Sequence, residues 1–209
     1  MIIAVDGPTA SGKGTIAKAL AAHFGLPHLD TGLLYRAVGR QVSLTGGNPD
    51  DPADALAACH FEDALLADPE LRTEATGGYA SRVSVHPAVR AALLARQQAF
   101  AKQPGGAVLD GRDIATVIAP HADAKLFVTA SVPARALRRW MEMKSLGLDV
   151  DRGEIEADLE ARDERDRNRV EAPLRQAEGA VLLDTSNLAK EMAVAAAIAL
   201  VEKQLARPT

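Results

Sequence analysis

The chain has 209 residues, of which 47% are hydrophobic and 25% charged, and this composition is typical of a globular protein. A chain of this length removes about 70% of its unfolded surface from water, so its core needs no disulfide or structural metal. The single cysteine, Cys59, excludes an intramolecular disulfide and a zinc site built on several thiolates.

Charge and hydropathy exclude two further classes of partner. Lysine and arginine total 24 against 28 aspartate and glutamate residues, giving a net charge of -4, whereas a duplex-binding domain usually carries a basic excess. Aromatic residues make up only 3% of the chain, so few side chains could stack on single-stranded bases. The longest apolar run, Ala193 to Val201, has nine residues, against the roughly 20 that cross a bilayer. The start, Met1 to Asp6, carries no basic leader. We therefore expect a cytoplasmic protein that contacts neither nucleic acid nor membranes.

Short apolar runs alternate with helical patterns along the chain. Each run has the length of a buried strand and lacks polar alternation, as parallel strands covered on both faces require. The predicted strands span 2–6, 28–30, 107–111, 124–131 and 180–185. The predicted helices span 13–24, 32–44, 86–103, 133–147, 151–169 and 188–205. This alternation predicts a three-layer α/β fold around an open parallel sheet. Only the glycine-containing stretch from about 45 to 85 interrupts it, and we expect this stretch to form an inserted substrate-binding lobe.

A glycine-rich turn directly follows the first predicted strand and opens the first predicted helix. It reads Gly7-Pro8-Thr9-Ala10-Ser11-Gly12-Lys13-Gly14-Thr15. Glycines let the backbone N–H groups surround an anion, and the helix N-terminus adds the positive end of its dipole. Lys13 supplies a mobile positive charge for the terminal phosphates of a nucleoside triphosphate. In the common pattern a hydroxyl that ligates Mg²⁺ follows the lysine directly. Here Gly14 intervenes, so we assign no metal ligand to the loop and keep Thr15 as a hydroxyl donor to a phosphate.

Two later strands also end in polar residues, at the sheet edge where open α/β sheets hold ligands. The second strand leads into Asp30-Thr31-Gly32 and then Tyr35-Arg36, and the third ends in Asp110-Gly111-Arg112-Asp113. A guanidinium suits a phosphate, and a carboxylate suits an amino group on a base. The alternative interpretations are a helix cap at Asp30-Thr31 and a surface ion pair between Arg112 and Asp113.

The charged segment 155–169 has an ordered spacing. One helical face carries Ile155, Leu159, Arg162, Asp166 and Arg169, separated by 4, 3, 4 and 3 residues. The same wheel places Glu160, Asp163, Arg165 and Arg167 elsewhere. The apolar pair would anchor the face to the core, and three charges in a partly buried place require a ligand or a paired network. An exposed face with i,i+4 ion pairs is the alternative.

Together these residues resemble bacterial cytidylate kinases over essentially the full chain. The resemblance rests on the phosphate loop, Leu29-Asp30-Thr31-Gly32 with Tyr35-Arg36, Pro87-Ala88-Val89-Arg90, Gly111-Arg112-Asp113 and Arg162-Asp163-Glu164-Arg165-Asp166-Arg167-Asn168-Arg169. It implies a P-loop kinase fold with a five-stranded parallel sheet. It also implies transfer of the γ-phosphoryl group of ATP, with Mg²⁺, to CMP or dCMP. The implied organisation is one domain, with a core over 1–44 and 86–209, a monophosphate-binding lobe over about 45–85 and a short lid over about 144–153.

The resemblance also implies roles for individual residues. It places Ser81, Arg90 and Asp113 around the cytosine ring, and Arg162 and Asp166 at the ribose. It places Arg36, Arg112 and Arg169 toward the acceptor phosphate or base, with Thr31 where the family commonly has serine.

The reaction itself needs charge stabilisation rather than a general base, because the attacking phosphate oxygen is already anionic. We therefore assign catalysis to Lys13, Arg112 and a lid arginine. For that arginine, we hypothesise that Arg139 or Arg152 reaches the ATP phosphates, and we favour Arg139.

Two other functions remain open from sequence, and we expect a monomer in each case. One is a kinase for another small acceptor, such as AMP, UMP or shikimate. The other is a nucleotide-binding regulatory protein that hydrolyses ATP slowly. A requirement of ATP turnover for an added nucleoside monophosphate separates the kinases from the regulatory protein.

Overall fold

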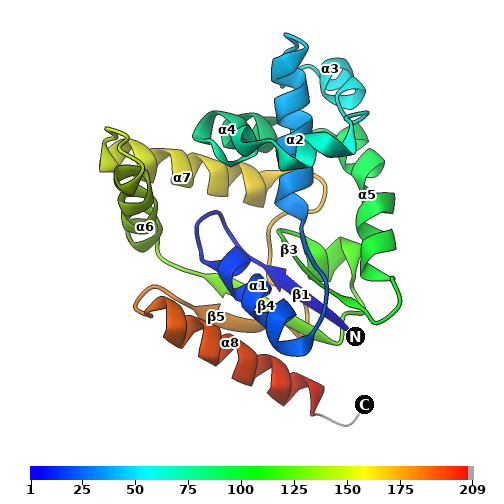
Figure 1. The fold of residues 1–209 in the computed structure, drawn as a ribbon, viewed down its shortest axis with the longest axis vertical. Coiled ribbons are helices and arrows are strands. Elements are labelled where there is room, and N and C mark those ends of the chain that lie inside the picture. Colours follow the sequence, from blue (N-terminus) through cyan, green and yellow to red (C-terminus); the bar gives the residue numbers. More distant parts are fainter. Residues whose placement is uncertain (207–209) are drawn as a thin grey trace. The chain divides into compact units, whose positions relative to one another are not determined.

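The computed structural model describes residues 1–206 and contains a five-stranded sheet with strand order β2-β3-β1-β4-β5 (Figure 1). The strands are β1 (Ile2–Asp6), β2 (His28–Asp30), β3 (Ala107–Gly111), β4 (Ala124–Thr129) and β5 (Val181–Asp184). Strand β1 pairs in parallel with β3 and β4, and β4 pairs in parallel with β5. The predicted strands and the parallel α/β sheet are therefore confirmed.

The strand register brings the polar strand ends to one edge of the sheet. Asp6, the last residue of β1, lies opposite Gly111 of β3 and Phe127 of β4. Strand β1 is almost completely buried in the middle of the sheet. The loops that follow β1 and β3 therefore start side by side, as expected at the carboxyl edge of an open parallel sheet.

Each predicted helix is present, with ends within two residues of the expected ones. These helices are α1 (Lys13–Phe24), α2 (Thr31–Leu44), α5 (Pro87–Ala101), α6 (Val132–Ser145), α7 (Arg152–Asn168) and α8 (Lys190–Leu205). The structure adds α3 (Pro52–Ala57), the short 3₁₀ helices η1 (Asp63–Ala67) and η2 (Pro69–Arg72), and α4 (Glu74–Val83). A single π-helical turn, η3 (Ile114–Ile118), follows β3.

The chain divides into two compact units. The first contains Met1–Leu29 and the chain from Ala101 onward. Its core joins the central strands to α1 and α8, which Figure 1 shows in front of the sheet. On α1, Ile16 and Leu20 are one helical turn apart and both are buried there. This packing holds the start of α1 at the end of β1, and so positions the loop between them.

The second unit, Asp30–Phe100, is helical. Leu34, Val38 and Val42 recur every four residues on α2, and all three are buried in the core of this unit. Helix α4 packs against the same core through Ala80 and Val83. No helix within residues 1–206 is long and apolar enough to cross a membrane.

Candidate active site

The loop between β1 and α1 has the backbone geometry of an anion cradle. A Cβ atom on Gly7 would lie 2.0 Å from the carbonyl oxygen of Val128, so only glycine fits there. Gly12, at the N-cap of α1, has a φ of 89°, and its own residue provides no side-chain cap for this helix N-terminus. Ala10 adopts the left-handed region with a φ of 60°, which costs a non-glycine residue about 1–2 kcal/mol.

Three backbone groups of this loop are held by neighbouring elements. The N–H of Gly7 donates to the carbonyl of Gly111 at 3.3 Å. The hydroxyl of Thr185, just after β5, donates to the carbonyl of Ser11 at 2.9 Å. The carbonyl of Thr9 accepts a bond of 3.1 Å from Arg135 on α6. The last two contacts occupy the carbonyl oxygens of Ser11 and Thr9, and the first occupies the N–H of Gly7.

Ser11 and Lys13 bring polar side chains to the same loop. The hydroxyl of Ser11 is fully buried and meets no hydrogen-bond partner within residues 1–206. A buried hydroxyl without a partner is costly, and a phosphate oxygen would satisfy it. Lys13 is the first residue of α1, so its ammonium adds to the positive end of the helix dipole.

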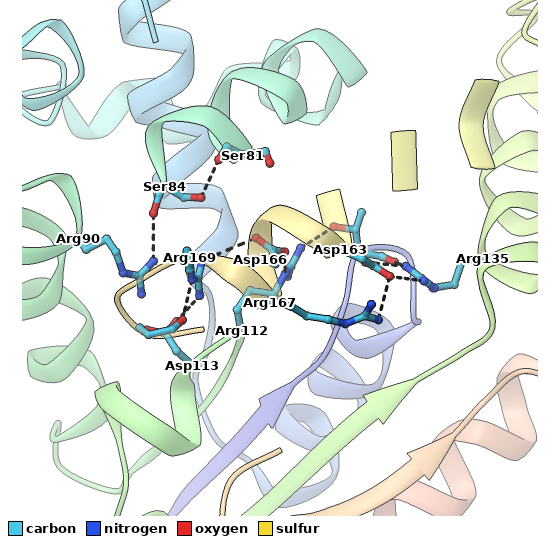
Figure 2. A network of polar contacts seen from close by, with 12 residues as sticks. Ser81, Ser84, Arg90, Arg112, Asp113, Arg135, Asp163, Asp166, Arg167 and Arg169 are labelled. Carbon is cyan, nitrogen blue, oxygen red and sulfur yellow. Dashed lines mark hydrogen bonds and ion pairs between the residues drawn. The ribbon is translucent and has the colours of Figure 1, made fainter. Parts of the chain in front are cut away.

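Arg112 connects this loop to α7. Its Nε donates to Oδ2 of Asp166 at 2.7 Å, and its Nη2 donates to the hydroxyl of Thr9 at 2.6 Å. Figure 2 shows Arg112 and Asp166 meeting between β3 and α7. Both residues are substrate ligands predicted from sequence, and the structure brings them into direct contact although they lie 54 residues apart.

The positive charges around Asp166 determine its ionisation. Burial alone would raise the pKa of this carboxyl, but the guanidinium groups of Arg112 and Arg169 and the ammonium of Lys13 hold the pKa below its usual value. Asp166 is therefore a carboxylate throughout the neutral range. The three cations around this carboxylate suit a polyanionic ligand.

Asp113 and Arg169 extend the same network. Nη2 of Arg169 lies 3.9 Å from Oδ1 of Asp113, and its Nη1 lies 3.7 Å from Oδ1 of Asp166. Both side chains of the Asp113–Arg169 pair are almost fully buried. Arg169 follows the last residue of α7 and donates through Nε to the carbonyl of Ala172, which fixes its direction.

Asp6 lies beneath these residues at the end of β1. Its two oxygens accept the N–H groups of Ile114 and Ala115, each at 2.8 Å, and so anchor η3. Burial, together with the nearby charge of Asp113, raises the pKa of Asp6 to about 7 against the lowering effect of the two N–H donors.

Asp110, the next carboxylate along this edge, lies against the start of α1. Its Oδ2 lies 3.8 Å from the position that a Cβ on Gly14 would take. Its Oδ1 lies 2.7 Å from Nε2 of His28 on β2. Asp110 therefore presents a buried oxygen beside the phosphate loop, where it could serve as one ligand of a divalent cation.

The second unit gathers its own predicted ligands. Arg90 lies over the ring of Tyr35, 5.6 Å from its centroid, and donates to the carbonyl of Ser84 at 3.4 Å. The hydroxyl of Ser84 in turn donates to the carbonyl of Ser81 at 2.9 Å, as drawn in Figure 2. Thr31 is buried at the N-terminus of α2.

Comparison with known proteins assigns the family. A family model described as cytidylate kinase matches residues 3–203. A cytidylate kinase of Xanthobacter autotrophicus is 58% identical over 99% of both chains. One of Caulobacter vibrioides is 55% identical over 99% of this chain and 97% of its own. The chain belongs to the cytidylate kinase family. A solved structure of an uncharacterized protein from Eubacterium ventriosum covers 99% of both chains with a TM-score of 0.54 at 14% identity, which is a likeness of fold alone. The expected P-loop kinase fold is confirmed.

Three arginines predicted in this cytidylate kinase bind protein groups in the structure. Arg36 donates through Nη1 to the carbonyls of Leu71 and Thr73, at 2.8 and 3.0 Å. Arg139 pairs with Glu142 on its own helix at 2.6 Å. Nε of Arg162 lies 2.7 Å from Oδ2 of Asp158, one turn earlier on α7. Arg152, the alternative lid arginine, pairs with Glu156 at 3.1 Å.

The helical wheel of α7 was wrong at one residue. Leu159, Arg162 and Asp166 are buried as predicted, but Asp163 is buried with them and pairs with Arg135. The signal was present in the spacing, because Asp163 stands four residues after Leu159 and three before Asp166, which also defines a shared face. No role was predicted from sequence for His28 or Thr185, and each of them contacts a residue of the site.

Proposed function

We propose that this cytidylate kinase transfers the γ-phosphoryl group of ATP to CMP or dCMP at the carboxyl edge of its sheet. The observation that carries the proposal is Arg112, which links Thr9 of the phosphate loop to the buried carboxylate of Asp166. One guanidinium in contact with both sets of predicted ligands is suited to a reaction that joins two polyanions.

ATP binds at the phosphate loop in this proposal. The backbone N–H groups from Thr9 to Thr15 surround the phosphates, and the unpartnered hydroxyl of Ser11 adds a donor. Lys13 contacts the terminal phosphates from the first turn of α1. Arg139 belongs to the catalytic set in this proposal. Its partner Glu142 is exposed, and an ion pair with an exposed carboxylate adds little stability, so the phosphates of ATP can replace it.

CMP is the phosphoryl acceptor in this proposal. Asp113 accepts the cytosine amino group, and Asp166 accepts a ribose hydroxyl. The segment of about 45–85 acts as the acceptor-binding lobe, and the segment of about 144–153 as the lid. The other acceptor ligands are Thr31, Arg36, Ser81, Arg90, Arg112, Arg162 and Arg169.

The attacking oxygen of CMP needs no general base, since its phosphate is anionic at neutral pH. What the site supplies is in-line alignment and positive charge around the transferred group. Asp166, kept ionised by its arginine neighbours, orients Arg112 for this task. Closure of the lid would exclude water and suppress hydrolysis of ATP.

The residues present fit Mg²⁺ as the metal of the ATP complex. Within residues 1–206 no group of three or more His, Cys, Asp or Glu side chains could hold a metal ion. Sites of this kind use one or two carboxylates, with phosphates and waters as the other ligands. Asp110 offers a single buried carboxylate beside Gly14. Bound there, Mg²⁺ would neutralise phosphate charge during transfer.

The test is release of ADP from ATP and Mg²⁺, with CMP, dCMP, UMP, AMP, shikimate or no acceptor added in parallel. We expect fast turnover only with CMP and dCMP. Turnover that is equal without any acceptor would make the protein an ATPase, and turnover with AMP or shikimate would reassign the acceptor. We also infer that the enzyme is cytoplasmic and monomeric. Analytical ultracentrifugation would test the oligomeric state.

A further inference from the structure

Arg135 is almost fully buried at the base of α6, 2% exposed, and every contact it makes is internal. Its Nε donates to the carbonyl of Ala130 at 2.9 Å, and Nη1 donates to the carbonyl of Thr9 at 3.1 Å. Nη1 and Nη2 also donate to the two oxygens of Asp163, at 3.1 and 2.6 Å. Figure 2 shows this paired arrangement of Arg135 and Asp163. The guanidinium is therefore fixed in one orientation.

The contact with Thr9 determines the direction of a neighbouring donor. A trans peptide is planar, so its C=O and the following N–H point in opposite directions. When Arg135 draws the carbonyl of Thr9 outward, the N–H of Ala10 must point to the other side, into the loop. A flipped peptide would instead aim a carbonyl oxygen at the phosphates and repel them.

The loop needs such a restraint because its backbone is strained. Ala10 has a φ of 60°, a region that a non-glycine residue occupies only when its surroundings impose it. The hydroxyl of Thr9 is held as well, by Arg112 at 2.6 Å. Thr9 is thus fixed at two points, one on its backbone and one on its side chain.

Helix α6 also restrains the Ser11–Gly12 peptide, through Thr185. The carbonyl of Ser11 accepts the hydroxyl of Thr185, which directs the N–H of Gly12 to the opposite side. Nη1 of Arg138, one turn after Arg135, donates to that hydroxyl at 3.1 Å. Two arginines of one helix therefore determine two peptide planes of the loop.

We propose that Arg135 and Asp163 are positioning residues for phosphoryl transfer, which hold the Thr9–Ala10 peptide in its phosphate-binding orientation. Neither residue touches the nucleotide. Arg135 acts through the Thr9 carbonyl, and Asp163 acts by orienting Arg135. The inference rests on the proposed binding of ATP at this loop, and it adds a dependence of that binding on α6 and α7.

The test replaces the buried pair as a whole, with Arg135→Met and Asp163→Leu in one protein. Removing one partner alone would strand a buried charge, whereas exchange of both for apolar residues is often neutral for stability. The control is Arg167→Met, because Arg167 pairs with the same Asp163 at 3.4 Å from an exposed position, 60% accessible. Calorimetry measures the Kd of ATP and of CMP, and urea unfolding verifies that each protein is folded.

We expect the Kd of ATP to rise about 10- to 100-fold in the double variant, the loss of one charge-assisted hydrogen bond. The Kd of CMP should change much less, and the control should bind both ligands as the wild type does. The amide resonance of Ala10 should move on ATP binding in the wild type and move little in the double variant. A structural role alone would leave this resonance and the ATP Kd unchanged in a folded double variant, and that result overturns the inference.

A second variant covers the case in which the double variant does not fold. Arg135→Lys keeps the charge beside Asp163, but one ammonium cannot replace the fork that joins Ala130, Thr9 and Asp163. We expect at least about a fivefold rise in the Kd of ATP, and an unchanged value overturns the inference. Failure of the wild type to bind ATP would instead refute the proposed function.

Discussion

Asp6 should make the stability of this protein depend on pH. Its pKa of about 7 in the folded chain, against 3.8 for the ordinary side chain, means that the folded state binds a proton more tightly than the unfolded state. A carboxyl of this kind contributes stability that is fully present below pH 3.8 and is lost as pH rises through 7. Linkage between these two pKa values gives a loss of about 3 kcal/mol in the free energy of unfolding between pH 5 and pH 8.

The perturbation is Asp6→Asn, which keeps the size of the side chain and removes the titration. The amide costs roughly 1–3 kcal/mol at every pH, because its NH₂ group faces one of the two N–H donors, of Ile114 or Ala115. The diagnostic quantity is therefore the slope of the free energy of unfolding against pH. Urea unfolding at pH 5, 6, 7 and 8 should show the wild type losing about 3 kcal/mol more than the variant.

The difference between the two proteins is measured rather than the wild-type slope alone, because the contributions of all other groups cancel in it. A carbon-13 NMR titration of the Asp6 carboxyl gives the pKa directly. Parallel slopes, with Asp6 titrating near 3.8, would refute the reasoning. They would mean that the two backbone N–H donors outweigh the cost of burying the charge.

Three further predictions concern the loop, the acceptor and the lid. Gly7→Ala should cost about 3 kcal/mol or more of stability and abolish ATP binding, as measured by unfolding and calorimetry, because the new Cβ would lie 2.0 Å from the carbonyl of Val128; a folded variant with normal affinity contradicts this. Asp113→Asn should lower kcat/KM for CMP by about 10- to 100-fold, from the loss of a charged acceptor for the cytosine amino group, while UMP is affected less; equal losses for both nucleotides would argue against base recognition. Trp140, the only tryptophan, donates to the carbonyl of Val150 at 3.2 Å, so its fluorescence should change when ATP and CMP together close the lid, and constant emission would refute closure there.

The sheet and its main helices were predictable from sequence because their signals are local. Buried parallel strands need continuous apolar runs, and the runs at 2–6 and 107–111 are fully apolar up to their polar ends. The secondary structure of the region 45–85 was harder to predict from sequence. It forms α3, two 3₁₀ helices and α4, elements too short to develop a clear hydrophobic period.

The candidate site was predictable only where its residues are contiguous or share a helix face. The phosphate loop is one uninterrupted segment, and the α7 face follows helical spacing. The contact between Arg112 and Asp166 joins different elements, and no local pattern specifies it. The same holds for Arg135, whose position at the start of α6 shows its role only when the Thr9 carbonyl and Asp163 are seen beside it.

The position of β1 in the sheet also governs when the nucleotide site can form during synthesis. The first strand made pairs with β3 and β4, so it must wait for more than 100 residues of chain before its neighbours leave the ribosome. Anchoring of Ser11 by Thr185 comes later still. Contacts so distant in sequence slow folding and leave an apolar strand exposed in the meantime. ATP can therefore stabilise only a nearly finished chain, and its binding would mark the completion of folding.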